Sequence, residues 1–175
     1  MVLAAEIIIH AVMTEGLYGT SIPFFGIERR GSPVACFVRI DDRPIREKDQ
    51  IYKPDCIMVG DQSLFSSVDI FAGVKEGAIL VLNSTKDPKI DALPPQIARL
   101  GVVDATKIAL EVLGIPVVNT AMVGAFAMTT HWIQVQSILE GIRQVMPQKL
   151  AERNAEAARR AAQEIRIVDI QRMPK

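Results

Sequence analysis

The sequence has 175 residues, of which 49% are hydrophobic and 23% charged, and its formal net charge is zero. This is the size and balance of one globular domain with a core of its own. Zero net charge and an aromatic content of only 5% argue against nucleic-acid binding through charge or base stacking. No apolar run is long enough to cross a membrane, and no signal peptide opens the sequence, so we expect a cytoplasmic protein.

Cysteine and histidine are too sparse here to suggest a metal centre. Cys36 and Cys56 both lie in apolar, strand-like runs, which is typical of buried free thiols in a reducing compartment. No Cys-x-x-Cys pair is present, so we do not expect the chain to hold an iron–sulfur cluster or a Cys-rich zinc site. His10 and His131 are far apart and lack a second ligand at metal spacing, so we predict no metal-binding or catalytic role for either.

The first residues, 1–14, have apolar side chains near helical spacing, which predicts a helix with Gly16 near its C-terminal cap. A helix this apolar normally follows a strand and a tight turn, so we expect either that such a strand is missing before Met1 or that the chain has an unusual start. Residues 17–22 are predicted to form a short strand.

A charged loop, residues 28–33, then precedes the next strand. Its adjacent Arg29 and Arg30 could form an anion clamp, because the planar guanidinium group matches phosphate or carboxylate oxygens. Gly26 and Gly31 would let the backbone approach a ligand closely. The alternative is that both arginines are solvated turn residues, and spacing alone favours it.

The rest of the chain alternates short apolar strands with helices. Strands are predicted at residues 34–40, 56–61, 78–83 and 101–104, with a turn at 41–44. Helices are predicted at residues 62–76 (one or two short ones), 105–113, 121–128, 134–145 and 148–165. This alternation predicts an α/β fold with a mainly parallel sheet. We expect one domain over residues 1–175, in which 147–175 form a long polar helix and an ambiguous tail.

Polar residues stand at or just past the ends of four apolar runs: Asp61, Asn83, Asp104 and Asn119. If the runs are parallel strands, these side chains line the carboxyl edge of the sheet, where open α/β folds bind ligands. The alternative, favoured for each residue alone, is that they cap helices or close turns. Together with Arg29 and Arg30, the edge could bind an anion such as a phosphorylated cofactor. No motif for a catalytic nucleophile, metal or nucleotide is present, so no reaction and no catalytic residue are predicted.

Three stretches then give a family likeness. They are FFGIERRGSPV with VRIDDRPI, IYKPDCIMVGDQSLF, and VDATKIALEVLGIPVVNTAMVGAF. With them the chain strongly resembles, from residue 1 to about 165, the gamma subunit of 2-oxoacid:ferredoxin oxidoreductases. The match is closest to the pyruvate and 2-oxoisovalerate type.

The resemblance implies a three-layer α/β/α Rossmann-like domain that is inactive alone. Such complexes oxidatively decarboxylate a 2-oxoacid, transfer the acyl group to coenzyme A and reduce ferredoxin. Thiamine diphosphate is held by the alpha and beta subunits, and iron–sulfur clusters by beta and delta. The gamma part packs against the catalytic subunits and helps bind coenzyme A. The expected partners are therefore the alpha, beta and delta subunits, and ferredoxin through the complex, with no nucleic acid and no membrane.

The same resemblance assigns phosphate contact to Arg29 and Arg30, with Gly31 and Ser32 as backbone or hydroxyl donors. The family's glycine-rich turn, of the GRGGQG kind, would precede Met1 and is absent from this sequence, which leaves open whether the chain alone binds coenzyme A. The alternative is a docking module, in the same or a 2-oxoisovalerate, 2-oxoglutarate or oxalate complex, whose basic loop contacts only a partner subunit. We expect the isolated chain to expose apolar surface and to homodimerise.

Overall fold

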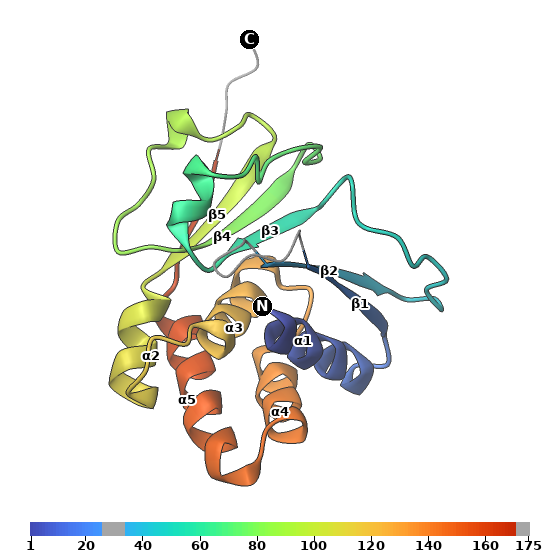
Figure 1. Cartoon of the computed structure of the whole chain (residues 1–175), viewed down its shortest axis with the longest axis vertical. Coiled ribbons are helices and arrows are strands. Elements are labelled where there is room, and N and C mark those ends of the chain that lie inside the picture. The colour runs from blue at the N-terminus through green and yellow to red at the C-terminus, as the bar shows by residue number, and fades with distance from the viewer. Residues whose placement is uncertain (26–33, 171–175) are drawn as a thin grey trace.

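The computed structural model describes residues 1–25 and 34–170, which form a layered α/β fold (Figure 1). The α-helices of this part are α1 (Val2–Thr14), α2 (Ala105–Leu113), α3 (Asn119–Thr130), α4 (Val135–Val145) and α5 (Gln148–Glu164). The strands are β1 (Tyr18–Phe25), β2 (Val34–Asp41), β3 (Cys56–Val59), β4 (Ala78–Asn83), β5 (Ile97–Val103) and β6 (Arg166–Asp169). Two 3-10 helices, η1 (Gln62–Ser66) and η2 (Ile90–Ala92), follow β3 and β4 in the chain. The predicted α/β class is confirmed.

The main sheet of the described residues has the strand order β3-β4-β5-β6. β3, β4 and β5 are parallel, and β6 runs antiparallel to β5, with Gly101 opposite Ile167. β4 and β5 are buried along most of their length, as expected for parallel strands covered on both faces. The mainly parallel sheet is therefore confirmed, whereas the sequence had left the tail that forms β6 unassigned.

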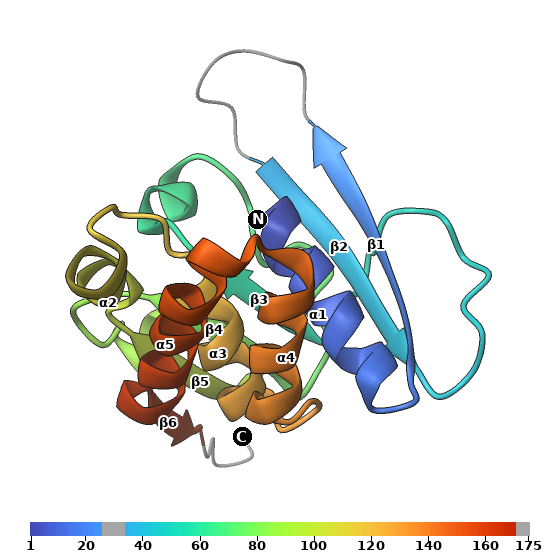
Figure 2. The ribbon, with the colours of Figure 1, turned by 90° about the horizontal axis from the view of Figure 1, so that it is seen from below.

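β1 and β2 form a separate two-stranded antiparallel sheet, with Tyr18 opposite Asp41 and Phe25 opposite Val34. Figure 2 shows this hairpin extending along one side of α1. Gly19 allows the close approach, since a Cβ atom there would lie 2.6 Å from a methyl group of Val12. Both strands were predicted from sequence, but their pairing was not.

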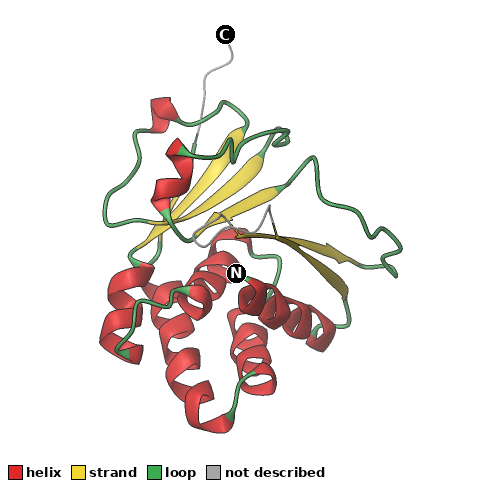
Figure 3. Cartoon of the chain, viewed as in Figure 1, coloured by secondary structure: helices red, strands yellow, loops and turns green. Residues whose placement is uncertain are grey.

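The two faces of the main sheet are covered differently (Figure 3). All the described α-helices lie on one face and enclose the larger hydrophobic cluster, which includes Ile7, Val81 and Ile138. The other face is covered by η1, η2 and loops over a smaller cluster that includes Leu80 and Leu100. The third layer thus consists of short 3-10 turns, and residues 62–76 contribute η1 and turns rather than α-helix.

α5 is more than the polar helix that its composition suggested. Its alanines, among them Ala155, Ala158 and Ala161, are fully buried. They pack on α3, where a Cβ atom at Gly124 would lie only 2.0 Å from the Ala158 carbonyl oxygen. The two helix backbones therefore touch, and the charged residues of α5 occupy its other face. Within residues 1–25 and 34–170, no helix is both long and apolar enough to cross a bilayer.

Candidate functional site

A cavity of about 1190 Å³ lies at the carboxyl ends of β3, β4 and β5. The polar residues predicted at strand ends, Asp61, Asn83, Asp104 and Asn119, all line it. Because parallel strands run in the same direction, the residues that directly follow them lie at the same edge of the sheet. The four polar residues predicted at one edge of the sheet therefore line a common cavity.

Asn83 holds three elements together at the floor of this cavity. Its side-chain amide nitrogen donates to the Gly60 carbonyl and to the Thr106 hydroxyl, both at 2.9 Å. Its side-chain oxygen accepts a hydrogen bond from the Thr106 backbone N–H at 3.3 Å. Asn83 at the end of β4 thus fixes the end of β3 and the start of α2.

The two aspartates at the cavity also act as caps. Asp61 accepts from the Ser63 backbone N–H at 2.9 Å, and this hydrogen bond lowers the pKa of the Asp61 carboxyl. Asp104 accepts from the Lys107 backbone N–H at 2.9 Å and so starts α2. The alternative drawn from the sequence, that these residues cap helical turns, therefore holds together with the edge placement.

Three helices begin at this cavity, because Met1, Thr106 and Asn119 from the starts of α1, α2 and α3 line it. The N-terminal end of a helix has a partial positive charge and free backbone N–H groups. Neither α1 nor α3 has a side-chain cap hydrogen bond at its first turn. The cavity is therefore electrostatically suited to an anionic group.

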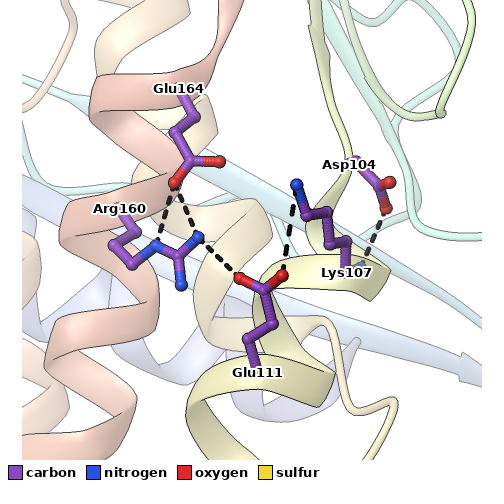
Figure 4. Close-up of polar contacts among 5 residues, drawn as sticks. All are labelled: Asp104, Lys107, Glu111, Arg160 and Glu164. Carbon is purple, nitrogen blue, oxygen red and sulfur yellow. Dashed lines mark hydrogen bonds and ion pairs between the residues drawn. The ribbon is translucent and has the colours of Figure 1, made fainter.

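A chain of ion pairs joins the cavity wall to α5 (Figure 4). The Lys107 ammonium lies 4.0 Å from one oxygen of Glu111, while Arg160 approaches the other oxygen at 2.9 Å. Arg160 also pairs with Glu164 at 2.8 Å. These contacts hold α2, which lines the cavity, against α5.

The predicted phosphate contacts Arg29, Arg30, Gly31 and Ser32 lie outside the described residues. The flanks of that segment are described: Phe25 pairs with Val34, and Val34 lines the cavity. Val34, the first described residue after that segment, is therefore part of the cavity rim.

Thr106 and Lys107 are among the cavity residues that sequence reasoning missed. Their position in the first turn after the cap Asp104 was the signal that could have revealed them. His10 and His131 are outside the cavity lining, and His131 ends α3 with a φ of 55°. Within the described residues, no group of three or more His, Cys, Asp or Glu side chains could hold a metal ion.

Residues 1–164 match the family described as pyruvate ferredoxin/flavodoxin oxidoreductase. The chain is 44% identical to the pyruvate/ketoisovalerate oxidoreductases common subunit gamma of Thermococcus litoralis, over 97% of this chain and 92% of that protein. It is 45% identical to pyruvate synthase subunit PorC of Methanothermobacter thermautotrophicus, over 94% of this chain and 88% of that one. The chain therefore belongs to the pyruvate ferredoxin/flavodoxin oxidoreductase family, and the predicted resemblance to its gamma subunits is confirmed.

Solved structures agree with this assignment. The pyruvate oxidoreductase subunit PORC of Thermotoga maritima superposes with a TM-score of 0.78 at 29% identity, over 95% of this chain and 90% of that one. The gamma subunit of a keto/oxoacid ferredoxin oxidoreductase of Geobacter sulfurreducens gives 0.68 at 18% identity, over 93% and 87% of the two chains, which supports the fold alone.

Proposed function

We propose that this chain is the gamma subunit of a multi-subunit, cytoplasmic 2-oxoacid ferredoxin oxidoreductase, with pyruvate as the expected substrate. The support is the family match over residues 1–164 and the relatives named as gamma or PorC subunits. The chain would be inactive alone and would work with alpha, beta and delta subunits, which pass electrons to ferredoxin. Thiamine diphosphate and iron–sulfur clusters would belong to those partners. Four thiolates usually hold such a cluster, and this chain has only two cysteines.

We further propose that the edge cavity helps bind coenzyme A. The observation behind this proposal is the convergence of three helix N-termini on one cavity of about 1190 Å³. That volume is slightly above the roughly 300–1,000 Å³ typical of ligand pockets and is large enough for a nucleotide-sized ligand. Coenzyme A is rich in phosphate, and helix N-termini stabilise phosphate groups.

The basic segment would complete this site. Arg29 and Arg30 would contact phosphate oxygens through their guanidinium groups, and Gly31 and Ser32 would donate backbone or hydroxyl hydrogen bonds. The placement of Val34 at the cavity rim supports this role, because Ser32 is two residues away along the chain.

Partner docking is a second role, and the outer face of the hairpin favours it. Tyr18 and Phe24 are 46% and 48% exposed on that face. Phe24 packs edge to face against Phe37, with ring centroids 6.2 Å apart. Exposed aromatic side chains in one place are typical of protein interfaces. The same surface would explain homodimer formation by the isolated chain.

Filling the cavity tests the coenzyme A proposal. Gly60 lines the cavity, and a Cβ atom there would lie 3.4 Å from a methyl group of Val118 and 3.7 Å from the Met1 sulfur, which line it too. In the assembled enzyme, Gly60→Leu should raise the KM for coenzyme A at least tenfold and leave the KM for the 2-oxoacid unchanged. Gel filtration would verify assembly. An unchanged KM for coenzyme A in an assembled complex would refute the proposal.

A double variant, Arg29→Ala with Arg30→Ala, separates cofactor binding from docking. If the basic segment binds coenzyme A, the variant should co-purify normally with its partner subunits and show a raised KM for coenzyme A. If the segment only docks a partner, the variant should fail to co-purify.

A further inference from the structure

Lys107 is the only residue with a cationic side chain among the described residues that line the edge cavity. Three carboxylates line the same cavity: Asp61, Asp104 and Glu111. Of these, Glu111 is the one placed to neutralise Lys107, since it lies one helical turn further along α2. Whether the Lys107 ammonium is free to bind a ligand therefore depends on how closely Glu111 pairs with it.

Glu111 pairs more closely with Arg160 than with Lys107. Arg160 donates to it at 2.9 Å, whereas the Lys107 ammonium is at 4.0 Å, the outer limit of an ion pair (Figure 4). The Arg160 side chain is 27% exposed and that of Lys107 is 60% exposed, so the Arg160 contact is also the less screened one. Arg160, which also pairs with Glu164 at 2.8 Å, thus binds the Glu111 carboxylate more closely than Lys107 does and competes with Lys107 for it.

The two aspartates do not take the place of Glu111. Asp104 accepts its hydrogen bond from the backbone N–H of Lys107 and not from the ammonium group. Asp61 is bound to the backbone N–H of Ser63 in η1. No ion pair of Lys107 other than that with Glu111 is present among the described residues.

We propose that Lys107 contacts a phosphate group of the ligand in the edge cavity, and that Arg160 is a positioning residue that keeps Glu111 from neutralising it. The proposal rests on the proposed coenzyme A role of this cavity and adds the residues that recognise the phosphate. An ammonium on the first turn of a helix adds a mobile positive charge to the fixed partial charge of the helix N-terminus.

The test compares two acyl acceptors in the assembled enzyme: coenzyme A, and pantetheine, which has no phosphate group. Lys107→Ala should lower kcat/KM for coenzyme A about tenfold, equivalent to about 1.4 kcal/mol, and leave that for pantetheine unchanged. Lys149→Ala removes an exposed lysine outside the cavity lining and should change neither value. Equal losses for both acceptors, or no loss for coenzyme A, would overturn the role of Lys107.

A charge-rescue series tests the role of Arg160. Arg160→Ala should raise the KM for coenzyme A about threefold with little change in kcat, because Glu111 becomes free to pair with Lys107. Adding Glu111→Gln to this variant should restore the KM, since the amide has no charge to oppose Lys107. Arg143→Ala breaks a comparable arginine–glutamate pair, with Glu152, away from the cavity and should leave the KM unchanged. If Glu111→Gln fails to restore the KM, Arg160 acts through structure alone.

The cavity-filling variant Gly60→Leu keeps the two proposals apart. If it leaves the KM for coenzyme A unchanged, the coenzyme A role of the cavity is wrong. If Gly60→Leu raises the KM and Lys107→Ala does not, the cavity binds coenzyme A and only the Lys107 contact is wrong.

Discussion

The contact between α3 and α5 and the cavity at the carboxyl edge differ in almost every physical respect. At Gly124 and Ala158 the two helix backbones touch, and nearly every neighbouring side chain is small and buried. At the cavity many side chains are polar, and some of these are held individually through hydrogen bonds, as Asn83 and Asp104 are. The comparison predicts that stability depends more on the helix contact than on any single hydrogen bond at the polar edge.

The largest expected effect is at the helix contact. Gly124→Ala places a methyl group within 2.0 Å of the Ala158 carbonyl oxygen, where neither backbone can move cheaply. We expect a loss of about 3 kcal/mol or more in the free energy of unfolding. Urea denaturation followed by circular dichroism would measure it.

Gly77→Ala is the matched control for this variant. No atom lies within 4 Å of a Cβ there, and the only cost is the φ of 81°, about 1 kcal/mol. If both substitutions lower the free energy of unfolding equally, α3 and α5 do not pack closely at Gly124. The proposed difference between the helix contact and the cavity would then be wrong.

Removing the Asn83 side chain, which links the ends of β3 and β4 to α2, should lower the free energy of unfolding by less than Gly124→Ala does. Asn83→Ala leaves the Thr106 N–H without its acceptor and the Gly60 carbonyl without its donor. We expect a loss of about 2 kcal/mol, typical of partly buried hydrogen-bonding groups left without partners. A loss of 3 kcal/mol or more would mean that the edge is as essential to the fold as the helix contact.

Removing the helix cap Asp104 should lower the free energy of unfolding by less than Asn83→Ala does. Asp104→Ala removes the acceptor for the Lys107 N–H at the start of α2 and should cost about 1 kcal/mol. Asp104→Asn keeps an acceptor oxygen and should retain most of the stability. Thermal unfolding of the two variants would show whether the hydrogen bond or the charge is responsible.

The smallest effect is expected at the exposed pair of Arg143 and Glu152, 2.8 Å apart. The hydrogen bond from Arg143 lowers the pKa of Glu152 below its ordinary value of 4.5. The pair therefore stabilises the fold above about pH 4.5 and loses this contribution as the pH falls further. Arg143→Ala should lower Tm slightly at pH 7 and not at pH 3. An equal change at both pH values would exclude the ion pair as the cause.

The sequence predicted those elements whose ends have their own chemical signals. α2 has the predicted bounds because Asp104 caps its start and Gly114, with a φ of 79°, ends it. β4 likewise has the predicted bounds, as a short apolar run between Gly77 and a polar end. The pairing of β1 with β2 was not predicted, and neither was the close approach of Gly19 to Val12 of α1, which no local pattern encodes. The many charged residues of α5 led to its interpretation as a polar helix, and the buried alanines that pack on α3 were not predicted.

The location of the site could be predicted from the sequence, whereas most contacts between its side chains could not. Strand ends placed Asp61, Asn83, Asp104 and Asn119 at one edge because parallel strands share their direction. The part played by Glu111 was not accessible, because it depends on Arg160, which is 49 residues away in sequence and reaches α2 only through the packing of α5.

The hairpin of β1 and β2 is held to the rest of the molecule by side-chain packing and not by strand pairing. Its strands hydrogen-bond to each other and not to the main sheet, so opening it breaks no strand pairing of β3 to β6. Two-stranded ribbons are marginally stable, and such local openings take place at a small fraction of the global free energy of unfolding. Backbone amides of Tyr18–Phe25 should therefore exchange with deuterium well before those of β4. The hairpin is consequently a part of the molecule that can rearrange while the parallel sheet remains intact.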